Sequence, residues 1–424
     1  MDIKSNLSYL YGLNRLGIKT SLDNIKALGR ELGNPQNSYP IVHIAGTNGK
    51  GMTAAMLHNI LHQAGYRSGL YTSPHLQRFG ERIRVGQNIL TDLQAGEYIE
   101  ELRPLFERVQ STFFESTTVI AFWHFKRARA DIAIIEVGLG GSWDATNIVN
   151  PIISIFTPIS LDHIDRLGNE VGQIAADKAG IIKPGADVVS ALQEKAALTE
   201  IRKKSDETNC PFHYAPQEFP ILTGKVNPFD SNVTVLSERN YEFKGNWRIP
   251  AAGKHQWINL QTVLSAVTAL QNRGFNLPLN LVKKGVETVQ WAGRLQVLQK
   301  APLVYFDVAH NPAAAKVIRE FFLEVFPACK PRILMGIVND KDIAGVIAEL
   351  SLIAADFTFV ELPTHRSAEG ELLALDARLK GSAARVIKNP SEALRIVMQE
   401  TPSDKIILII GSHYWGEAVF DFFK

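Results

Sequence analysis

Short apolar runs alternate with amphipathic stretches through most of the chain. In the first half the apolar runs are Ile41–Ala45, Arg67–Thr72, Asp131–Glu136 and Ile152–Phe156. Runs of this length bounded by Gly or Pro are typical of buried parallel strands. The spacing predicts a helix from about Met52 to Gln63, ended by Gly65. Strand and helix alternation predicts an α/β architecture with parallel sheets.

The middle of the chain, residues 212–247, follows a different pattern. Asn232–Leu236 and Tyr241–Phe243 alternate apolar and polar residues, which predicts an antiparallel hairpin. Helices are predicted to resume at His255–Asn272 and Leu279–Val289.

After Gly293-Arg294 the alternation of strands and helices restarts. The predicted strands are Val304–Asp307, Ile333–Met335, Phe357–Val360 and Ile406–Ile410. They indicate a second doubly wound α/β unit. We therefore expect two domains, residues 1–295 and residues 296–424, with the boundary near 294–300.

Composition agrees with two domains of a soluble enzyme. The 424 residues exceed what one core usually organises. Hydrophobic residues make up 46% and charged residues 21%. The formal net charge is only +2 and no long basic run occurs, so we expect neither nucleic acid nor a membrane surface as a partner.

Cysteine usage and the start of the chain bear on its compartment. Cys210 and Cys329 are too far apart in sequence for a disulfide framework or a zinc cluster, so both are expected to be reduced thiols. The starting segment Met1–Leu7 lacks the apolar stretch of a signal peptide. A cytoplasmic protein is the expectation.

The segment Gly46-Thr-Asn-Gly-Lys-Gly51 gives the strongest functional signal. It lies between a predicted strand and a predicted helix, the context of a phosphate-binding loop. Backbone N–H groups and the helix N-terminus bind oxyanions there, and Lys50 adds a positive charge. The alternative, a tight turn with a surface lysine, explains less of the pattern.

This loop departs from the standard Walker A motif, which places Ser or Thr after the lysine to hold magnesium. Gly51 and Met52 stand there instead. Ser73, after the next strand, can supply the missing hydroxyl. Glu136 closes a strand in the manner of a Walker B acid, which indicates a magnesium ligand over a simple surface charge.

Other polar residues carry weaker signals by themselves. His163 follows a strand end, and a lone histidine is more often structural. Lys178 reads as a solvated helix lysine. His58 and His62 have the spacing of a zinc protease helix, but Asn59 stands where the catalytic glutamate belongs.

Taken together, these segments resemble the folylpolyglutamate synthase family, including its bifunctional dihydrofolate synthases, within the Mur ligase superfamily. The resemblance spans both predicted domains and follows the family's order. The matching segments are Ala45–Gly51, Thr72–His75, Glu136–Gly141, Asp144–Asn147, Leu161–His163, Lys178–Pro184, Gly293–Gln296 and Phe306–Pro312. The family's fold is a phosphate-loop ATPase domain with a parallel sheet followed by a smaller, Rossmann-like glutamate-ligase domain.

The resemblance implies roles for individual residues. It implies that ATP is bound by Thr47, Asn48, Gly49, Lys50, Gly51, Asn259, Arg294, Asp307 and His310. It implies two Mg²⁺ sites held by Ser73, Glu136, His163 and Lys178, with Lys178 carbamylated. It implies a pterin-side pocket formed by Lys19, Thr20, Ser21, Thr112, Phe113, Phe114, Glu115, Trp143, Asp144 and Ala145. Lys50, His163, Lys178 and Arg294 are the expected catalytic residues.

The implied reaction is an ATP-dependent amide ligation. A substrate carboxylate would attack the γ-phosphate to give an acyl phosphate, and the amine of glutamate would displace phosphate. The partners would be dihydropteroate or folates, L-glutamate and ATP, bound by a monomer.

Three departures from the family pattern stand out. Met52 replaces the usual Ser or Thr, Ser142-Trp143 replaces an Arg-Leu pair, and Asp177 replaces a glutamate. The second departure concerns the substrate pocket directly.

Three other functions compete with the bifunctional ligase. A ligase that only elongates folates is a close variant. A Mur-type peptidoglycan ligase would need a sugar-nucleotide domain before the loop, where about 45 residues are too few. A nucleotide-binding regulator without turnover would not need Lys50, Glu136, His163 and Lys178 together.

Overall fold

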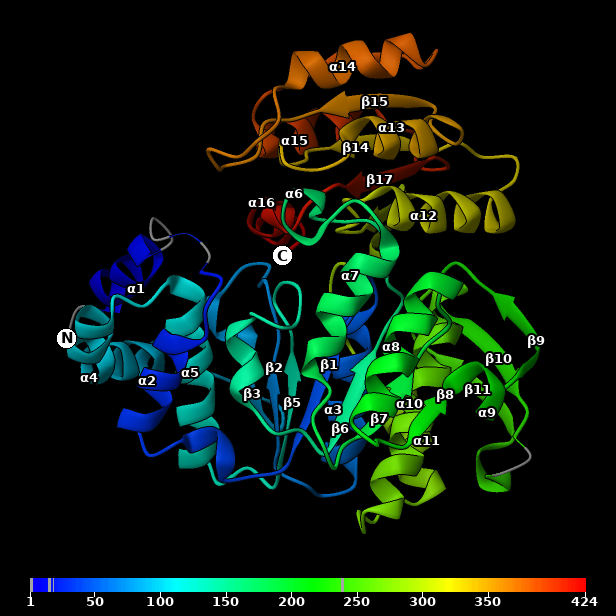
Figure 1. Cartoon of the computed structure of the whole chain (residues 1–424). Coiled ribbons are helices and arrows are strands. Elements are labelled where there is room, and N and C mark those ends of the chain that lie inside the picture. Colours follow the sequence, from blue (N-terminus) through cyan, green and yellow to red (C-terminus); the bar gives the residue numbers. More distant parts are fainter. Residues whose placement is uncertain (1–2, 14–16, 18, 238–239) are drawn as a thin grey trace.

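The described residues form three sheets, and the two larger ones, each with helices on both faces, lie one above the other in Figure 1. The structure is a computed structural model that describes residues 3–13, 17, 19–237 and 240–424, so Met1 and Asp2 of the starting segment lie outside it. The larger sheet has eight strands in the order β4-β3-β2-β5-β1-β6-β7-β8. These strands are β1 (Ile41–Ala45), β2 (Ser68–Tyr71), β3 (Ile83–Val85), β4 (Asn88–Ile89), β5 (Ile132–Glu136), β6 (Ile153–Phe156), β7 (Asp187–Ser190) and β8 (Phe212–Tyr214).

The four strands predicted in the first half are confirmed, and they are parallel neighbours in the order β2, β5, β1, β6. Antiparallel β3 and β4 extend the sheet at one edge and were not predicted. Their three and two residues are too few for a recognisable alternation.

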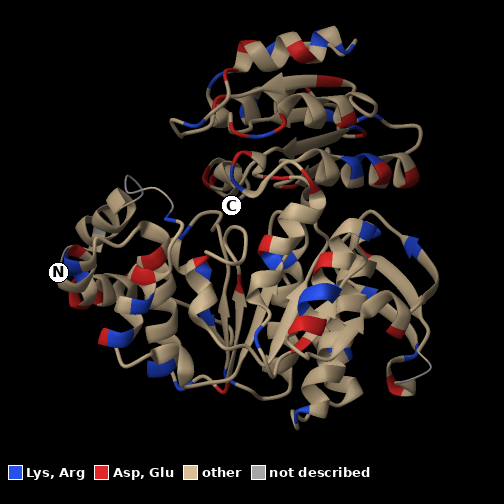
Figure 2. Ribbon diagram, viewed as in Figure 1, with Lys and Arg blue, Asp and Glu red and all other residues tan. Residues whose placement is uncertain are grey.

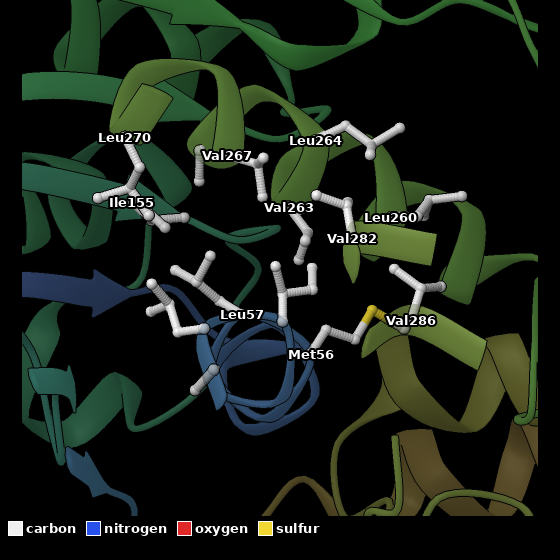
Figure 3. Packing of buried hydrophobic residues seen from close by; sticks show 14 of the residues in the cluster. Met56, Leu57, Ile155, Leu260, Val263, Leu264, Val267, Leu270, Val282 and Val286 are labelled. Atoms are coloured by element: carbon white, nitrogen blue, oxygen red, sulfur yellow. The ribbon is translucent and has the colours of Figure 1, made fainter. Parts of the chain in front are cut away.

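Alternate residues of these strands enter different cores, as the pleat of a strand requires. Val42 and Ile44 of β1 pack on one face, whereas Ile41 packs on the other. The first face is covered by α3 (Lys50–Gln63), α10 (His255–Asn272) and α11 (Leu279–Glu287). Figure 3 shows Met56 and Leu57 of α3 meeting Val263 of α10 and Val282 of α11.

The opposite face carries the remaining helices of this part of the chain. They are α1 (Ile3–Gly12), α2 (Asp23–Glu31), α4 (Asp92–Val109), α5 (Phe113–Arg127), α7 (Val171–Lys178) and α8 (Lys195–Glu207), with the short α6 (Ile164–Leu167) before α7. Capping boxes start α4 at Thr91 and α5 at Thr112.

The predicted hairpin is wrong in its second strand. Tyr241–Phe243 forms a 3₁₀ turn, and β10 (Ser231–Val235) pairs instead with β9 (Ile221–Val226) and β11 (Gly245–Ile249). Phe243 is fully buried against Trp247, whose indole N–H donates to the Phe243 carbonyl at 3.0 Å. Burial of this aromatic side chain outweighs the local alternation. The short helix α9 (Ala215–Glu218) precedes this sheet.

The second half of the chain forms a six-stranded sheet in the order β12-β13-β17-β14-β15-β16. The four predicted strands are confirmed as β13, β14, β15 and β17, whereas β12 and β16 were not predicted. Only β12 is antiparallel to its neighbour. The strands are β12 (Gln296–Lys300), β13 (Leu303–Phe306), β14 (Arg332–Met335), β15 (Asp356–Phe359), β16 (Ala384–Val386) and β17 (Ile406–Ile410). The helices are α12 (Pro312–Val325), α13 (Ile343–Ser351), α14 (Gly370–Leu379), α15 (Pro390–Glu400) and α16 (Gly416–Phe422). The predicted α/β class is therefore confirmed for both sheets.

The visible surface mixes both signs of charge. In Figure 2, Lys and Arg alternate with Asp and Glu over the helices around both sheets. Of the helices that the structure describes, none combines the length and apolar character needed to cross a membrane.

Candidate active site

The polar residues singled out above gather at one edge of the larger sheet. Because β2, β5, β1 and β6 are parallel neighbours, their carboxyl ends lie side by side. The loop follows β1, Ser73 follows β2 and Glu136 ends β5. Open parallel sheets bind their ligands at this edge.

Two glycines allow the loop its close turns. Gly46 and Gly49 have φ angles of 149° and 88°. A Cβ on Gly46 would lie 1.9 Å from the Thr157 hydroxyl, and one on Gly49 would lie 2.6 Å from the Asn259 amide oxygen. Both positions therefore require glycine, and the predicted ATP residue Asn259 lies directly against the loop.

Hydrogen bonds fasten the loop to the chain after β6. The Thr47 N–H donates to the Pro158 carbonyl at 3.0 Å, and the Thr47 hydroxyl donates to the Ser160 carbonyl at 3.0 Å. Lys50 donates to the carbonyls of Gly46 and Thr47, at 3.2 Å each. Lys50 is also the first residue of α3, so its charge and the helix N-terminus occupy the same place.

Ser73, Glu136 and Arg294 meet beside this loop. Together with Gly51 they line a small cavity of about 50 Å³. The Ser73 N–H donates to the Glu136 carboxylate at 3.2 Å. Burial raises the pKa of Glu136, while Lys50, this N–H and Arg294 act to lower it. A buried carboxylate beside a hydroxyl forms an oxygen donor pair that suits Mg²⁺.

Lys178 ends α7 and is almost fully buried. Its ammonium has no hydrogen-bond or ion-pair partner among residues 3–13, 17, 19–237 and 240–424. Burial first, and then the charge of Lys50, lowers its pKa to about 7. Because Lys178 is buried, its interpretation as a solvated lysine is wrong. An isolated ammonium is costly to bury, which is why its pKa is lowered.

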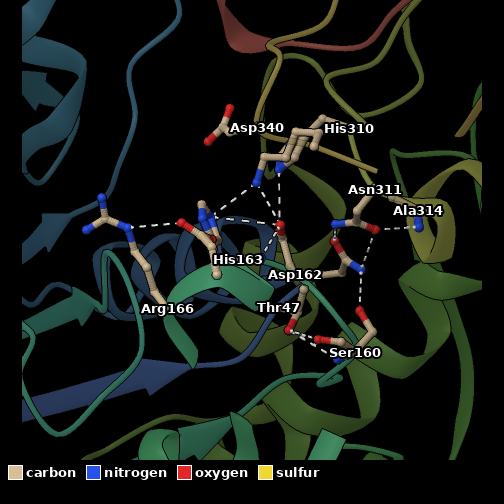
Figure 4. A network of polar contacts seen from close by, with 12 residues as sticks. Thr47, Ser160, Asp162, His163, Arg166, His310, Asn311, Ala314 and Asp340 are labelled. Carbon is tan, nitrogen blue, oxygen red and sulfur yellow. Dashed lines mark hydrogen bonds and ion pairs between the residues drawn. The ribbon is translucent and has the colours of Figure 1, made fainter. Parts of the chain in front are cut away.

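A network of charged groups joins the two sheets near His163. Asp162 pairs with Lys341 at 2.7 Å and with His310 at 3.7 Å (Figure 4). Lys341 also lies 3.2 Å from the His163 Nε2. Burial opposes ionisation of Asp162, yet His310 and Lys341 lower its pKa. Burial, and then Lys341, lower the pKa of His163 to about 4, so its ring is neutral.

A second link joins the loop itself to the C-terminal sheet. The side chains of Asn48 and Asn311 exchange hydrogen bonds at 3.1 and 3.4 Å (Figure 4). Asn311 also accepts the Ala314 N–H at 2.9 Å and so caps α12. The phosphate loop is therefore held directly by the second half of the chain.

A large cavity of about 1100 Å³ opens beside these groups. It is lined by every residue of the expected pterin-side pocket, although these come from separate segments. They are Lys19, Thr20, Ser21, Thr112, Phe113, Phe114, Glu115, Trp143, Asp144 and Ala145, and Ser73, His163 and His310 join them. Trp143, one of the departures from the family pattern, is 58% exposed in this wall.

Some of these residues also hold the backbone. Glu115 accepts the Thr112 N–H at 2.7 Å and so caps α5. Asp144 accepts the N–H groups of Gly138 and Leu139 at 3.0 and 2.9 Å. Asp307, expected to contact ATP, accepts the N–H groups of Leu295 and Ala309, at 2.7 Å each. These contacts show that Glu115, Asp144 and Asp307 hold the backbone of the site in place.

Sequence reasoning missed several residues of the cavity wall. They are Tyr11, His75, Arg82, Lys341, Arg366, His413 and Tyr414. For Lys341 a signal existed, because the charged segment Asp340–Asp342 follows the carboxyl end of a correctly predicted strand. Among the described residues, no group of three or more His, Cys, Asp or Glu side chains is placed to hold a metal.

Comparisons with known proteins agree with this arrangement. The Mur ligase middle domain matches residues 44–267, and the Mur ligase glutamate ligase domain matches residues 293–413. A Bacillus subtilis dihydrofolate synthase/folylpolyglutamate synthase is 30% identical over 96% of this chain and 96% of its own length. A Mycobacterium tuberculosis relative of the same name is 32% identical over 89% of this chain and 82% of its own.

Solved structures give the same result. Mycobacterium tuberculosis folylpolyglutamate synthase with ADP and AMPPCP superposes with a TM-score of 0.90 at 29% identity, covering 100% of this chain and 99% of its own. Escherichia coli FolC with DHPP and ADP has a TM-score of 0.86 at 29% identity, covering 98% and 97%. The chain is thus a member of the Mur ligase family, in its group of dihydrofolate synthases and folylpolyglutamate synthases.

Proposed function

We propose that this ATP-dependent ligase joins L-glutamate both to dihydropteroate and to the γ-carboxylate of reduced folates, releasing ADP and phosphate. The observation that carries the proposal is the large cavity, whose wall holds all ten expected substrate residues. It reaches Ser73 at the phosphate-loop edge of the sheet. The names of the full-length relatives support the same substrates.

The chain's own groups account for the order of events. The loop, Lys50 and Arg294 bind the phosphates of ATP, and Asn259 lies against the loop. An oxygen of the substrate carboxylate attacks the γ-phosphorus, forming an O–P bond as the bond to ADP breaks. The glutamate amine then attacks the acyl carbon, phosphate leaves, and the amine loses a proton as the amide forms.

Four residues of the site would supply donor groups for two magnesium ions. Ser73 and Glu136 would hold the first, and His163 and a carbamylated Lys178 would hold the second. When bound, magnesium neutralises negative charge on the phosphates. In the structure Lys341 lies 3.2 Å from His163, so this ammonium must move for His163 to bind a metal.

The surroundings of Lys178 support its carbamylation. A neutral amine can attack CO₂, forming an N–C bond and losing a proton to give an anionic carbamate. Lys178 is buried and has no ion-pair partner in the described part of the chain, and its lowered pKa leaves a large neutral fraction near pH 7. The carbamate adds oxygen donors that an ammonium lacks, which magnesium prefers.

Residues 1–295 would bind ATP and the pterin, and residues 296–424 would close over them. The contacts of Asn48 with Asn311 and of Asp162 with Lys341 already join the two parts. Closure would keep water from the acyl phosphate. We expect a monomer to suffice, because both parts come from one chain.

The deciding experiment is a ligation assay with dihydropteroate and tetrahydrofolate in parallel, with ATP and radiolabelled glutamate. Product from both acceptors is expected. Product from tetrahydrofolate alone would indicate a folate-elongating enzyme, and product from neither would refute the proposal. Lys50→Ala is the matched control and should lose roughly 10²–10³-fold in rate with both acceptors, because it removes a charge from the phosphates.

A further inference from the structure

One buried cation of the cavity wall forms no ion pair with any residue that the structure describes. Arg82 is only 8% exposed and lines the large cavity. No carboxylate lies within 4.0 Å of its guanidinium in the part of the chain that the structure describes. Buried arginines are normally paired, because an uncompensated charge is costly away from water.

The side chain of Arg82 is held in one orientation. Its Nε–H donates to the His75 Nδ1 at 2.7 Å. Its guanidinium lies over the Phe113 ring, 5.2 Å from the centroid, and Tyr11 stacks on the same ring at 5.6 Å. The His75 contact uses the Nε–H edge of the guanidinium, and Phe113 covers one of its faces. The two terminal NH₂ groups of Arg82 therefore remain for a ligand.

The backbone around Arg82 is equally fixed. Its carbonyl accepts the Thr72 N–H at 2.9 Å, next to Ser73. The preceding residue, Glu81, accepts the N–H groups of Leu76 and Arg78, at 2.8 Å each. Arg82 is therefore anchored to the turn that carries Ser73, and its position is preorganised.

The position of Arg82 selects one kind of anion. The phosphates of ATP already have the loop, Lys50 and Arg294. Arg82 instead lines the large cavity together with Tyr11 and Phe113, whose rings suit a flat substrate, and with Ser73. Ser73 and Glu136 both line the neighbouring small cavity. A carboxylate attached to a ring-bearing substrate would reach this place, and a guanidinium can bind its two oxygens in parallel.

We propose that Arg82, positioned by His75 and Phe113, binds the reacting carboxylate of the acceptor substrate and directs it toward the γ-phosphate. This inference rests on the proposed function, because it takes the carboxylate from that substrate. It makes Arg82 a carboxylate-specific residue of the acceptor site, distinct from the residues that contact the ring.

The test compares binding of dihydropteroate with binding of its neutral carboxamide, by calorimetry in the presence of AMPPCP. Wild type should prefer the carboxylate. Arg82→Gln should lose roughly 10- to 150-fold in affinity for the carboxylate, the range for hydrogen bonds to a charged group, and little for the carboxamide. Arg82→Lys should lose less, because it keeps the charge but not the paired geometry.

Arg78→Gln is the matched control, because Arg78 is exposed on the same turn. It should leave both affinities unchanged. Equal losses for the two ligands in Arg82→Gln would indicate a structural role and overturn the inference, as would an unchanged preference. In the ligation assay the KM for both acceptors should rise while the KM for glutamate stays constant. A raised KM for glutamate alone would show that Arg82 binds the incoming glutamate, and this result would overturn the inference.

The same data separate the inference from the proposed function. If wild type ligates glutamate but Arg82→Gln retains the preference for the carboxylate, only the inference fails. If wild type neither binds dihydropteroate nor ligates glutamate, both fail.

Discussion

Two buried lysines on either side of the active site differ in what surrounds them. Lys341, from the C-terminal sheet, pairs with Asp162 at 2.7 Å, and its side chain is 6% exposed. Lys178 lies at the end of helix α7, which packs on the larger sheet. It is 5% exposed and has no such pair among the residues that the structure describes. Two largely buried lysine side chains thus have opposite electrostatic surroundings.

The difference shows what a buried lysine can do. An ion pair fixes Lys341 as a cation that joins two parts of the chain. Without a pair, Lys178 has its pKa lowered to about 7, chiefly by burial, so its amine is available for chemistry. We therefore expect the presence of a carboxylate partner, more than the extent of burial, to separate a structural lysine from a reactive one.

The strongest way to break this comparison is Lys178→Ala. If Lys178 is a carbamylated metal ligand, the variant should lose at least about 100-fold in kcat, because an anionic ligand of the metal site is removed. Added bicarbonate should then change the kcat of the wild type and leave the kcat of Lys178→Ala unchanged. Carbon-13 NMR after equilibration with labelled bicarbonate should show a carbamate signal in wild type and none in Lys178→Ala.

The control is Lys183→Ala, a half-buried lysine five positions along the chain. Its kcat and its bicarbonate response should match wild type. A near-normal kcat in Lys178→Ala would contradict the carbamate role and would indicate that Lys178 has only a structural role.

The sequence could predict those parts of the site that local order determines. The loop is one segment between one strand and one helix. Four of the eight strands of the larger sheet, β1, β2, β5 and β6, were found because their side chains are buried on both faces. The ends of adjacent parallel strands then place Ser73 and Glu136 beside the loop. The family resemblance supplied the ten substrate residues of the cavity.

Long-range contacts escaped prediction for a physical reason. Lys341 meets Asp162 across 179 positions of sequence, and no periodicity encodes such a pairing. Arg82 looks like an ordinary charged residue until Thr72, His75 and Phe113 are seen around it. Phe243 was placed in a strand because local alternation carries no information about the pocket that buries it beside Trp247.

Lys341→Met should have a smaller effect than Lys178→Ala, and this effect should be on stability. The variant leaves the buried carboxylate of Asp162 without its closest partner, which costs roughly 3–5 kcal/mol for a fully buried pair and less here. Because the pair joins the two sheets, we expect weaker contact between them. Urea unfolding should show a lower free energy of unfolding or a separate, earlier transition of the C-terminal part.

A double-mutant cycle isolates the pair. In Lys341→Met/Asp162→Asn both charges are gone, so much of the loss should be recovered relative to Lys341→Met alone, with a coupling of roughly 0.5–3 kcal/mol. Simple addition of the two single losses would show that Lys341 and Asp162 are independent, and the contrast with Lys178 would disappear.

A partly buried histidine at the far edge of the larger sheet extends the comparison to stability alone. His213 on β8 lies 2.9 Å from Glu218 and 3.3 Å from Asp187, and Arg273 donates to Asp187 at 2.6 Å. Hydrogen bonds to Asp187 and Glu218 raise the pKa of His213 to about 9. Here two carboxylates favour the charged imidazole, the reverse of the situation at Lys178.

This raised pKa gives a pH dependence of defined sign. Since the folded protein holds the proton of His213 more tightly than the unfolded chain, the stabilisation is complete below pH 6.5 and is lost as the pH rises to about 9. The loss of stabilisation should be on the order of 2–3 kcal/mol.

Urea unfolding of wild type and His213→Gln at several pH values measures this loss, with exposed His365→Gln as the control. The gap between wild type and His213→Gln should close above about pH 9, while kcat stays unchanged because β8 lies at the sheet edge remote from the loop after β1. A gap that is constant across this range would show that His213 acts through packing and not through its charge.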